Sequence, residues 1–447
     1  MSVTADATSV FPRFLDLAYP NVERAEGVWL TTTDGHRVLD ASSGGAMVTC
    51  LGHVVPELIA AADRQATRIA YFYNHHFTNE QQERLADQVI DVVAPEMSRV
   101  RVVSGGSEAN ETAIQIARLY QVDRGQTERW RVISPAQSYH GSTMGTLALT
   151  GRPALQSPFG PYLADHLHIP PSTWRFDPTG EAALAELDRL LERHGDTVAA
   201  FFCEPVSAAA LPGYAPPAAF WEGLAKRRDE HGFLVCFDEV VTGVGRVGAW
   251  LAAHRLPIEP DIVTIGKGLG AGHAPLGAVL CREHVYDAVD GASREFDLGH
   301  TWDGAPLSCA VGLAVLEQIQ QRRLVERVRD RGPQLLGELR TAVQGSEVVR
   351  EVRGVGFLLG VELVDPRDGE SFLPVDVDAG ALVDDVAFEH GLLVSSTHPQ
   401  ADGFAGDQVT IAPAYTSTDD ELSEMVSRFA ETIHDVEGQV KRTLAGR

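Results

Sequence analysis

Lysine is almost absent from this chain. Of 37 basic residues among 447, only Lys226, Lys267 and Lys441 are lysines, and arginine supplies the other cations. Lys226 belongs to a Lys-Arg-Arg run and Lys441 lies in the C-terminal tail, where solvated cations are expected. Lys267 instead lies among glycines and apolar residues, in TIGKGLGAG. Such surroundings lower the pKa of an amine and favour a Schiff-base lysine, a role that arginine cannot take because it keeps its proton.

Other absences narrow the class of protein. No apolar run reaches membrane-spanning length, and residues 1–17 lack the basic and apolar segments of a signal peptide. The five cysteines have no CxxC spacing, and three lie in apolar, strand-like runs, which predicts small buried hydrophobes. A net charge of −25 disfavours nucleic acid and anionic membranes as partners. We therefore expect a soluble, cytoplasmic protein.

The chain is too long for one ordinary core, and its pattern changes once. Apolar runs alternate with helical patterns, and we predict strands near residues 100–103, 132–134, 198–203, 233–237, 262–265 and 277–281. This alternation predicts an α/β fold with a mostly parallel, doubly wound sheet. Beyond residue 320 we predict an α+β segment with helices at 323–342, 379–390 and 418–435 and strands near 348–352 and 357–363. The predicted division is 1–55, 56–320 and 321–447.

Two of the predicted strands each end at a charged residue. Asp238 follows the run 233–237, and Lys267 follows the run 262–265. Ligands of parallel sheets bind outside the carboxyl ends of the strands, so both side chains should face one crevice. An acid and an amine are costly to bury there unless they have a use. A purely structural Lys–Asp pair is the alternative, because ion-pair networks also shift pKa values.

A phosphate site is predicted where the strand at 100–103 turns into SGGSEANETAIQIARLY. Free N–H groups and the helix dipole at such a junction favour an anion, and Gly105 and Gly106 allow close approach of the backbone. An ordinary Ser/Gly helix cap is the alternative.

Two further patterns give weaker evidence of a binding site. Gly243, Gly245 and Gly248 match the GxGxxG dinucleotide fingerprint, which leaves a nucleotide-dependent oxidoreductase as a remote alternative. Five residues separate these glycines from the strand, however, and no clear helix opens at the third. The adjacent His75 and His76 lie in the aromatic segment YFYNHHF, for which packing is favoured over metal binding.

Taken together, the motifs resemble those of the class III (ω-) aminotransferases, pyridoxal 5′-phosphate (PLP) enzymes of fold type I. The resemblance spans residues 27–415 and is carried, in order, by SGGSEANETAIQIAR, SYHGSTMG, CEPV, DEVVTGVGRVG, PDIVTIGKGLGAGHAPLGA and GHTWDGAPLSCAVGLAVLE. It implies a large PLP-binding domain and a smaller α+β domain formed by the N- and C-terminal segments. It also implies a homodimer with shared active sites, without deciding between dimer and tetramer.

The resemblance implies a role for each matching residue. Lys267 would bond covalently to PLP and then move the proton during catalysis, and Asp238 would keep the ring nitrogen protonated. Thr301 would reach the phosphate of the partner subunit's cofactor. The other implied cofactor contacts are Gly106, Ser107, Tyr139, His140, Glu204, Val240 and Val241. Glu108 and Asn110, like His140, would support these contacts.

Departures from the family pattern bear on the substrate. Thr410 stands where many relatives carry an arginine for the substrate carboxylate, and residues 369–427 contain no lysine or arginine. Glu204 then lacks its usual partner, so we hypothesise a donor with a second cationic group that Glu204 recognises. Arg152 is the candidate for the acceptor carboxylate, Tyr71 and Tyr73 are candidate substrate contacts, and Arg246 and Arg353 are predicted to be structural.

The sequence thus predicts a PLP-dependent aminotransferase. It would move an amino group from an amine or (ω-)amino acid to a 2-oxo acid such as pyruvate or 2-oxoglutarate. The alternatives keep the cofactor but change the outcome: an aminomutase, a racemase or epimerase, or a decarboxylase of the same family.

Overall fold

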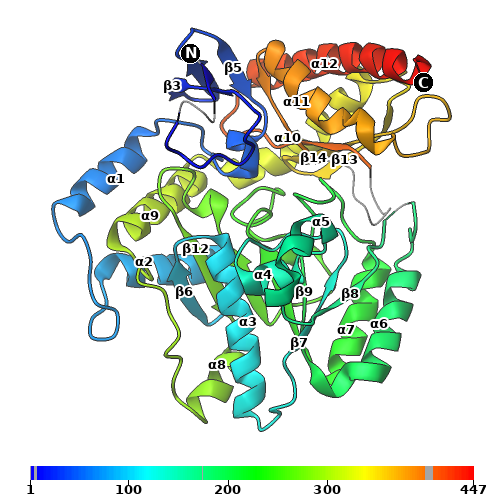
Figure 1. Ribbon diagram of the computed structural model, residues 1–447. Coiled ribbons are helices and arrows are strands. Elements are labelled where there is room, and N and C mark those ends of the chain that lie inside the picture. The colour runs from blue at the N-terminus through cyan, green and yellow to red at the C-terminus, as the bar shows by residue number, and fades with distance from the viewer. Residues whose placement is uncertain (1, 5–7, 174, 398–405, 447) are drawn as a thin grey trace.

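The computed structural model describes residues 2–4, 8–173, 175–397 and 406–446. Figure 1 shows a lower part built on a large sheet with helices on both faces, and an upper part in which the N- and C-terminal segments lie side by side. The two parts meet along the edge at which several strands of the large sheet end.

The large sheet has seven strands, mostly parallel, as predicted. Their spatial order is β6 (Arg99–Val103), β12 (Gly277–Cys281), β11 (Ile262–Ile265), β10 (Leu234–Glu239), β9 (Val198–Cys203), β7 (Arg131–Pro135) and β8 (Leu167–Ile169). Only β12 runs antiparallel to its two neighbours. The central strands β9, β10 and β11 are buried along their whole length, as expected for a parallel sheet covered on both faces.

Helices of the lower part cover this sheet. They are α1 (Pro56–Ala66), α2 (Glu80–Gln88), α3 (Gly106–Asp123), α4 (Met144–Leu149), α5 (Pro153–Gln156), α6 (Glu181–His194), α7 (Ala218–His231), α8 (Glu283–Asp290) and α9 (Pro306–Gln321). Helix α7 ends at Gly232, whose φ of 71° is the left-handed conformation common just after a helix.

The upper part joins the two ends of the chain in one sheet. Strands β3 (Val22–Glu26), β4 (Trp29–Thr32) and β5 (Arg37–Asp40) pair in sequence, and β5 pairs in parallel with β15 (Leu392–Leu393) from the C-terminal segment. A second sheet has the order β13 (Val349–Val355), β14 (Leu358–Leu363), β17 (Gln408–Ile411) and β16 (Ser395–Thr397). The short β1 (Ser2–Val3) pairs with β2 (Tyr19–Pro20).

Three long helices complete the upper part: α10 (Leu324–Ala342), α11 (Ala379–Glu389) and α12 (Asp419–Ala445). A capping box between Thr418 and Glu421 starts α12, which runs ten residues beyond the predicted end near residue 435. No helix within the described ranges is both long and apolar enough to cross a membrane. The domain limits at residues 55 and 320 stay a prediction.

Candidate active site

Asp238 lies at the centre of a buried hydrogen-bond network. It is the penultimate residue of β10 and is 6% exposed. Its Oδ2 accepts from Asn110 Nδ2 at 2.8 Å and lies 2.9 Å from His140 Nδ1, while among the described residues its Oδ1 accepts only from the backbone N–H of Val240 at 3.1 Å. The less engaged Oδ1 can therefore accept a further donor, such as a protonated ring nitrogen.

Asn110 and His140 hold this carboxylate in place. Asn110 also donates to the backbone carbonyl of His140 at 2.7 Å, and its own Oδ1 accepts from Thr264 on the adjacent β11. The backbone N–H of His140 donates to Thr150 Oγ1 at 3.0 Å. The sequence predicts supporting roles for Asn110 and His140, but it misses Thr264 and Thr150, which carry no motif signal of their own.

Lys267 lies in a strained turn two residues beyond the end of β11. Its φ of 42° is left-handed, a conformation that is uncommon outside glycine and is often found at functional sites. In the register between β10 and β11, Asp238 pairs with Thr264 and Glu239 pairs with Ile265, so the turn begins beside the Asp238 network. The structure thus brings the two predicted catalytic residues to one edge of the sheet.

The Lys267 amine has a pKa closer to neutral pH than that of a free lysine. Burial lowers its pKa to about 8; the carboxylates of Asp238 and Glu204 oppose this shift, and the guanidinium of Arg246 adds to it. A substantial fraction of the amine is therefore unprotonated at neutral pH, as a nucleophile or a base requires. No carboxylate in the described part of the chain lies within 4 Å of this amine.

The predicted phosphate site is the N-terminus of α3. Gly105 precedes the helix and supplies no side chain to cap it. A methyl group at Gly106 would lie 2.6 Å from Cγ1 of Val240, and one at Gly266 would lie 3.3 Å from the same atom. Ser107 Oγ accepts from the backbone N–H of Ser142 at 3.2 Å. These groups fit the parts of PLP. The uncapped N–H groups and the close approach at Gly106 suit its phosphate, the amine of Lys267 suits its aldehyde, and the carboxylate of Asp238 suits its ring nitrogen.

Glu204 follows β9 and is held by backbone groups. Its Oε2 accepts from the N–H of Tyr139 at 3.2 Å, and its Oε1 accepts from the N–H of Ala208 at 3.1 Å. Burial raises its pKa to about 7, and nearby Asp238 contributes to the rise. No arginine or lysine pairs with Glu204 among the described residues. Recognition of a donor cation by Glu204 stays a prediction.

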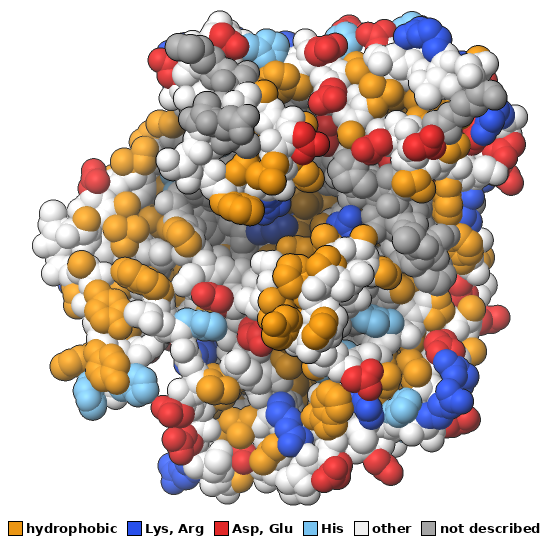
Figure 2. All heavy atoms as spheres, in the orientation of Figure 1, with side chains coloured by type: hydrophobic (Ala, Val, Ile, Leu, Met, Phe, Trp, Pro, Cys, Tyr) orange, Lys and Arg blue, Asp and Glu red, His pale blue; other side chains and the backbone are white. Residues whose placement is uncertain are grey.

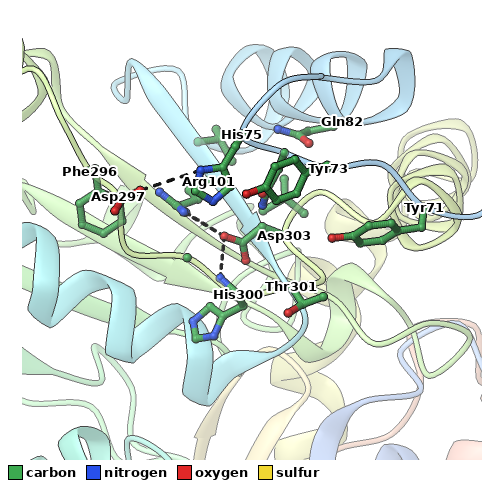
Figure 3. A pocket seen from close by; sticks show the side chains of 14 residues that line it. Tyr71, Tyr73, His75, Gln82, Arg101, Phe296, Asp297, His300, Thr301 and Asp303 are labelled. Atoms are coloured by element: carbon green, nitrogen blue, oxygen red, sulfur yellow. Dashed lines mark hydrogen bonds and ion pairs between the residues drawn. The ribbon is translucent and has the colours of Figure 1, made fainter.

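Three other predicted residues line a separate cavity. Tyr71, Tyr73 and Thr301 line a space of about 470 Å³ together with Arg101 and Asp303, which form an ion pair at 3.0 Å (Figure 3). In Figure 3 the hydroxyl groups of both tyrosines point toward Asp303. Neither Lys267 nor Asp238 lines this cavity. Within one chain, the residues around Lys267 and Asp238 and the cavity lined by Thr301, Tyr71 and Tyr73 are therefore distinct sites.

The arginines differ in how firmly they are held. Arg353 forms ion pairs with Glu351 at 2.9 Å and Glu362 at 3.2 Å, as expected of a structural residue. Arg152 immediately precedes α5 and is only partly buried, and its role toward an acceptor carboxylate stays a prediction. Thr410 is buried within β17. Figure 2 shows the face above the large sheet hollowed between the two parts, with basic side chains visible in the hollow.

The GxGxxG segment does not form a nucleotide site. Gly243, Gly245 and Gly248 lie in consecutive turns and open no helix. Gly248 instead packs on the backbone of Arg329, which a methyl group at this position would approach to 2.5 Å. Among the described residues no three His, Cys, Asp or Glu side chains gather as a metal site, and His75 contacts Asp297 and Tyr73.

Comparison with known proteins agrees with this geometry. The family model described as Aminotransferase class-III matches residues 15–433. The uncharacterized aminotransferase YodT of Bacillus subtilis is 33% identical over 436 residues, covering 96% of this chain and 98% of YodT. Gamma aminobutyrate transaminase 2 of Solanum lycopersicum is 32% identical over 444 residues, covering 96% and 94%.

Solved structures show the same fold. An (S)-enantioselective omega-transaminase from Thermomicrobium roseum superposes with a TM-score of 0.88 at 31% identity, covering 96% of each chain. The omega transaminase from Pseudomonas jessenii, solved in complex with PMP, gives a TM-score of 0.89 at 27% identity and 97% coverage of each chain.

The fold and the site define a PLP-dependent transferase of fold type I. The chain belongs to the class III aminotransferase family, and its cofactor is pyridoxal 5′-phosphate. Its general activity is transfer of an amino group from an amine or amino acid to a keto acid.

Proposed function

We propose that Lys267, Asp238 and the N-terminus of α3 form the catalytic site for transfer from an amine or ω-amino acid to a 2-oxo acid such as pyruvate or 2-oxoglutarate. The observation that carries this proposal is the meeting of a low-pKa amine, a hydrogen-bonded carboxylate and an uncapped helix N-terminus at one edge of the sheet. Ser107 and Gly106 hold the phosphate, and Tyr139, His140, Val240 and Val241 enclose the ring.

Each residue has a distinct task in the proposed reaction. PLP, when bound, withdraws electrons from the reacting carbon of the donor. Lys267 Nζ accepts the proton released from that carbon and returns it to a neighbouring atom, for which a pKa of about 8 is suited. Asp238 holds a proton on the ring nitrogen through its carboxylate, and Asn110 and His140 fix the direction of that carboxylate. Val240 fills the space between Gly106 and Gly266 and so sets the depth of the ring.

We also propose a homodimer in which Thr301, Tyr71 and Tyr73 complete the active site of the partner. The separation of their cavity from Lys267 within one chain supports this arrangement, because a shared site places the two halves on different chains. The five cysteines are free and buried, which supports a reducing, cytoplasmic location.

The first test is the visible absorbance spectrum of the purified protein, with monoamines, diamines and amino acids added one at a time. A true donor should convert the band of bound PLP to that of pyridoxamine phosphate, which ranks the donors directly. Product formation without this conversion would favour a racemase, mutase or decarboxylase outcome. Failure to acquire any PLP band, even with added cofactor, would refute the site.

The same donor panel tests the role of Glu204. If this carboxylate recognises a second cationic group, Glu204→Gln should lower the preference for diamines over monoamines by roughly tenfold, the size expected for one charged contact. An unchanged preference would remove Glu204 from substrate recognition without affecting the assignment of Lys267.

A further inference from the structure

Arg246 is a buried cation that has no acidic partner in the described part of the chain. It lies in the turns that follow β10, is 1% exposed and forms no ion pair there. Its Nη1 donates to the carbonyl oxygens of Phe357 at 3.1 Å and Pro413 at 2.6 Å, and its Nη2 donates to Ser43 Oγ at 3.0 Å. A buried charge without a counter-ion is costly, so three segments of the upper part use neutral oxygens to hold it.

The same guanidinium is linked to the turn that carries Lys267. Its Cζ lies 4.7 Å from the centre of the Tyr415 ring. A methyl group at Gly268 would lie 3.7 Å from Tyr415 Oη and 3.6 Å from Cys50 Sγ, so the turn rests on both side chains. Cys50 Sγ donates to the carbonyl of Gly268 at 3.4 Å, and the N–H of Tyr415 donates to the carbonyl of Cys50 at 2.7 Å.

These contacts explain how the strained turn persists. Lys267 and Ala271 both adopt left-handed φ angles, of 42° and 47°, which surrounding structure must impose. The packing of Gly268 on Cys50 and Tyr415 supplies that constraint from one side, and Arg246 fixes Tyr415 from the other.

The charge of Arg246 provides a second link between this residue and the Lys267 amine. The charged groups that act on Lys267 are Asp238, Glu204 and Arg246, and only Arg246 favours the neutral amine. The neighbouring Cys50 and Tyr415 carry no charge at neutral pH, because burial raises the pKa of Cys50 to about 12 and that of Tyr415 still further.

We propose that Arg246 is a positioning residue for Lys267: it fixes the lysine turn through Tyr415, and its enclosed charge favours the neutral amine. The relevance of this role to catalysis rests on the proposed function of Lys267. The sequence predicts a purely structural role for Arg246, and the structure extends that role toward the reacting amine.

The scarcity of lysine makes a direct test possible without cofactor. Lys226 and Lys441 form only surface ion pairs, with Glu230 and with Glu347 and Glu437, so replacing both by arginine leaves Lys267 as the single lysine. The pH dependence of acetylation of Lys267 in the PLP-free protein, followed by mass spectrometry of its peptide, gives the midpoint of its titration. Arg246→Met should move this midpoint upward by roughly half a pH unit or more, whereas Arg246→Lys, which keeps the charge, should leave it close to its original value. The amine added by Arg246→Lys falls in a separate tryptic peptide, because Arg255 lies between positions 246 and 267.

Comparison of charged and uncharged substitutions separates the effect of the Arg246 charge from its structural support of the turn. Circular dichroism first establishes which variants are folded, and Arg246→Gln, whose amide can still donate to one carbonyl, replaces Arg246→Met if the latter does not fold. An unchanged midpoint in a folded, uncharged variant would overturn the proposal. An equal shift in Arg246→Lys would support the positioning of the turn and overturn the part assigned to the charge. Because the measurement uses no PLP, it remains decisive even if the spectral test shows that Lys267 does not bind the cofactor.

Discussion

At the residue scale, close packing around the Lys267 turn accounts both for the left-handed backbone of Lys267 and for the lowered pKa of its amine. The glycines on either side let the turn close against Val240, Cys50 and Tyr415, which supports the left-handed backbone and leaves Lys267 only partly exposed. Loss of water disfavours the ammonium form, and this desolvation is the main cause of the lowered pKa. An arginine in the same turn would keep its charge and could not act as a nucleophile.

This lowered pKa has a consequence for cofactor uptake. Because only the unprotonated amine attacks an aldehyde, the rate at which PLP-free protein binds PLP covalently should rise nearly tenfold per pH unit below about 8 and level off above it. Stopped-flow absorbance at constant PLP concentration measures this profile. A plateau reached only above pH 10, near the value of a free lysine, would contradict the enclosure of the amine.

The sequence predicts the proximity of two residues whose chemistry is unusual for their surroundings, while their catalytic roles stay a prediction. Asp238 and Lys267 stand out because charged residues end apolar runs, and the order of parallel strands then brings them together. The contacts of Thr264 with Asn110 and of Arg246 with Pro413 could not be predicted in this way. They depend on side-chain packing between segments more than a hundred residues apart, which leaves no local pattern.

At the element scale, the first turn of α3 is the feature most sensitive to size. Gly106 has no room for a side chain, because Val240 approaches the place where its Cβ would lie to 2.6 Å. The helix therefore approaches the strand ends closely enough for its free N–H groups and the Lys267 turn to share one ligand.

Gly106→Ala should consequently weaken PLP binding by roughly tenfold or more, since it displaces Val240 or the helix from the ring site. Titration of the PLP-free protein with PLP gives the dissociation constant. The double variant Gly106→Ala with Val240→Ala, which removes the two clashing methyl groups, should recover part of the affinity. As a control, Gly337→Ala in α10 meets no atom within 4 Å and should leave PLP affinity unchanged. Equal affinity of Gly106→Ala and wild type would show that this close contact does not shape the cofactor site.

Elements with strong periodicity were predicted well, and short ones were not. Strands β9, β11 and β12 match the expected ranges because each is a continuous apolar run. Strand β8 and helices α4, α5 and α8 were missed, since three to eight residues carry too little periodicity. Helix α12 exceeds its predicted length because Val436, Val440 and Leu444 extend its buried stripe beyond residue 435.

At the scale of the whole molecule, two exposed loops concentrate apolar side chains. The loop between α1 and α2 exposes Tyr71, Tyr73 and Phe77, and the segment before α9 exposes Leu298 and Trp302. Tyr71 and Trp302 pack edge to face at 5.7 Å, which joins the two loops into one surface beside the cavity of Figure 3. In Figure 2, hydrophobic side chains gather along the same side of the molecule, over α1. Exposed apolar surface of this kind is typical of an interface, and it fits the proposed pairing of two copies of the chain.

A shared-site dimer makes a quantitative prediction for hybrids of two inactive variants. Lys267→Ala removes the amine, and Thr301→Asp places a negative charge where the partner's cofactor phosphate is proposed to lie. Random mixing of the two chains makes half of the dimers hybrids, each with one intact site, so roughly a quarter of wild-type activity should return. Activity assays of the co-expressed mixture measure this recovery, and the hybrid purified through two different affinity tags should show roughly half of wild-type activity.

The matched control uses Ser107→Asp in place of Thr301→Asp. Ser107 lies in the first turn of α3, in the same chain as the Lys267 that it serves, so the same charge placed there damages the proposed phosphate site from within one subunit. Hybrids of Lys267→Ala with Ser107→Asp contain no intact site and should stay inactive. Recovery in neither hybrid despite stable dimers would show that Thr301 does not act across the interface, and each active site would then lie within a single chain.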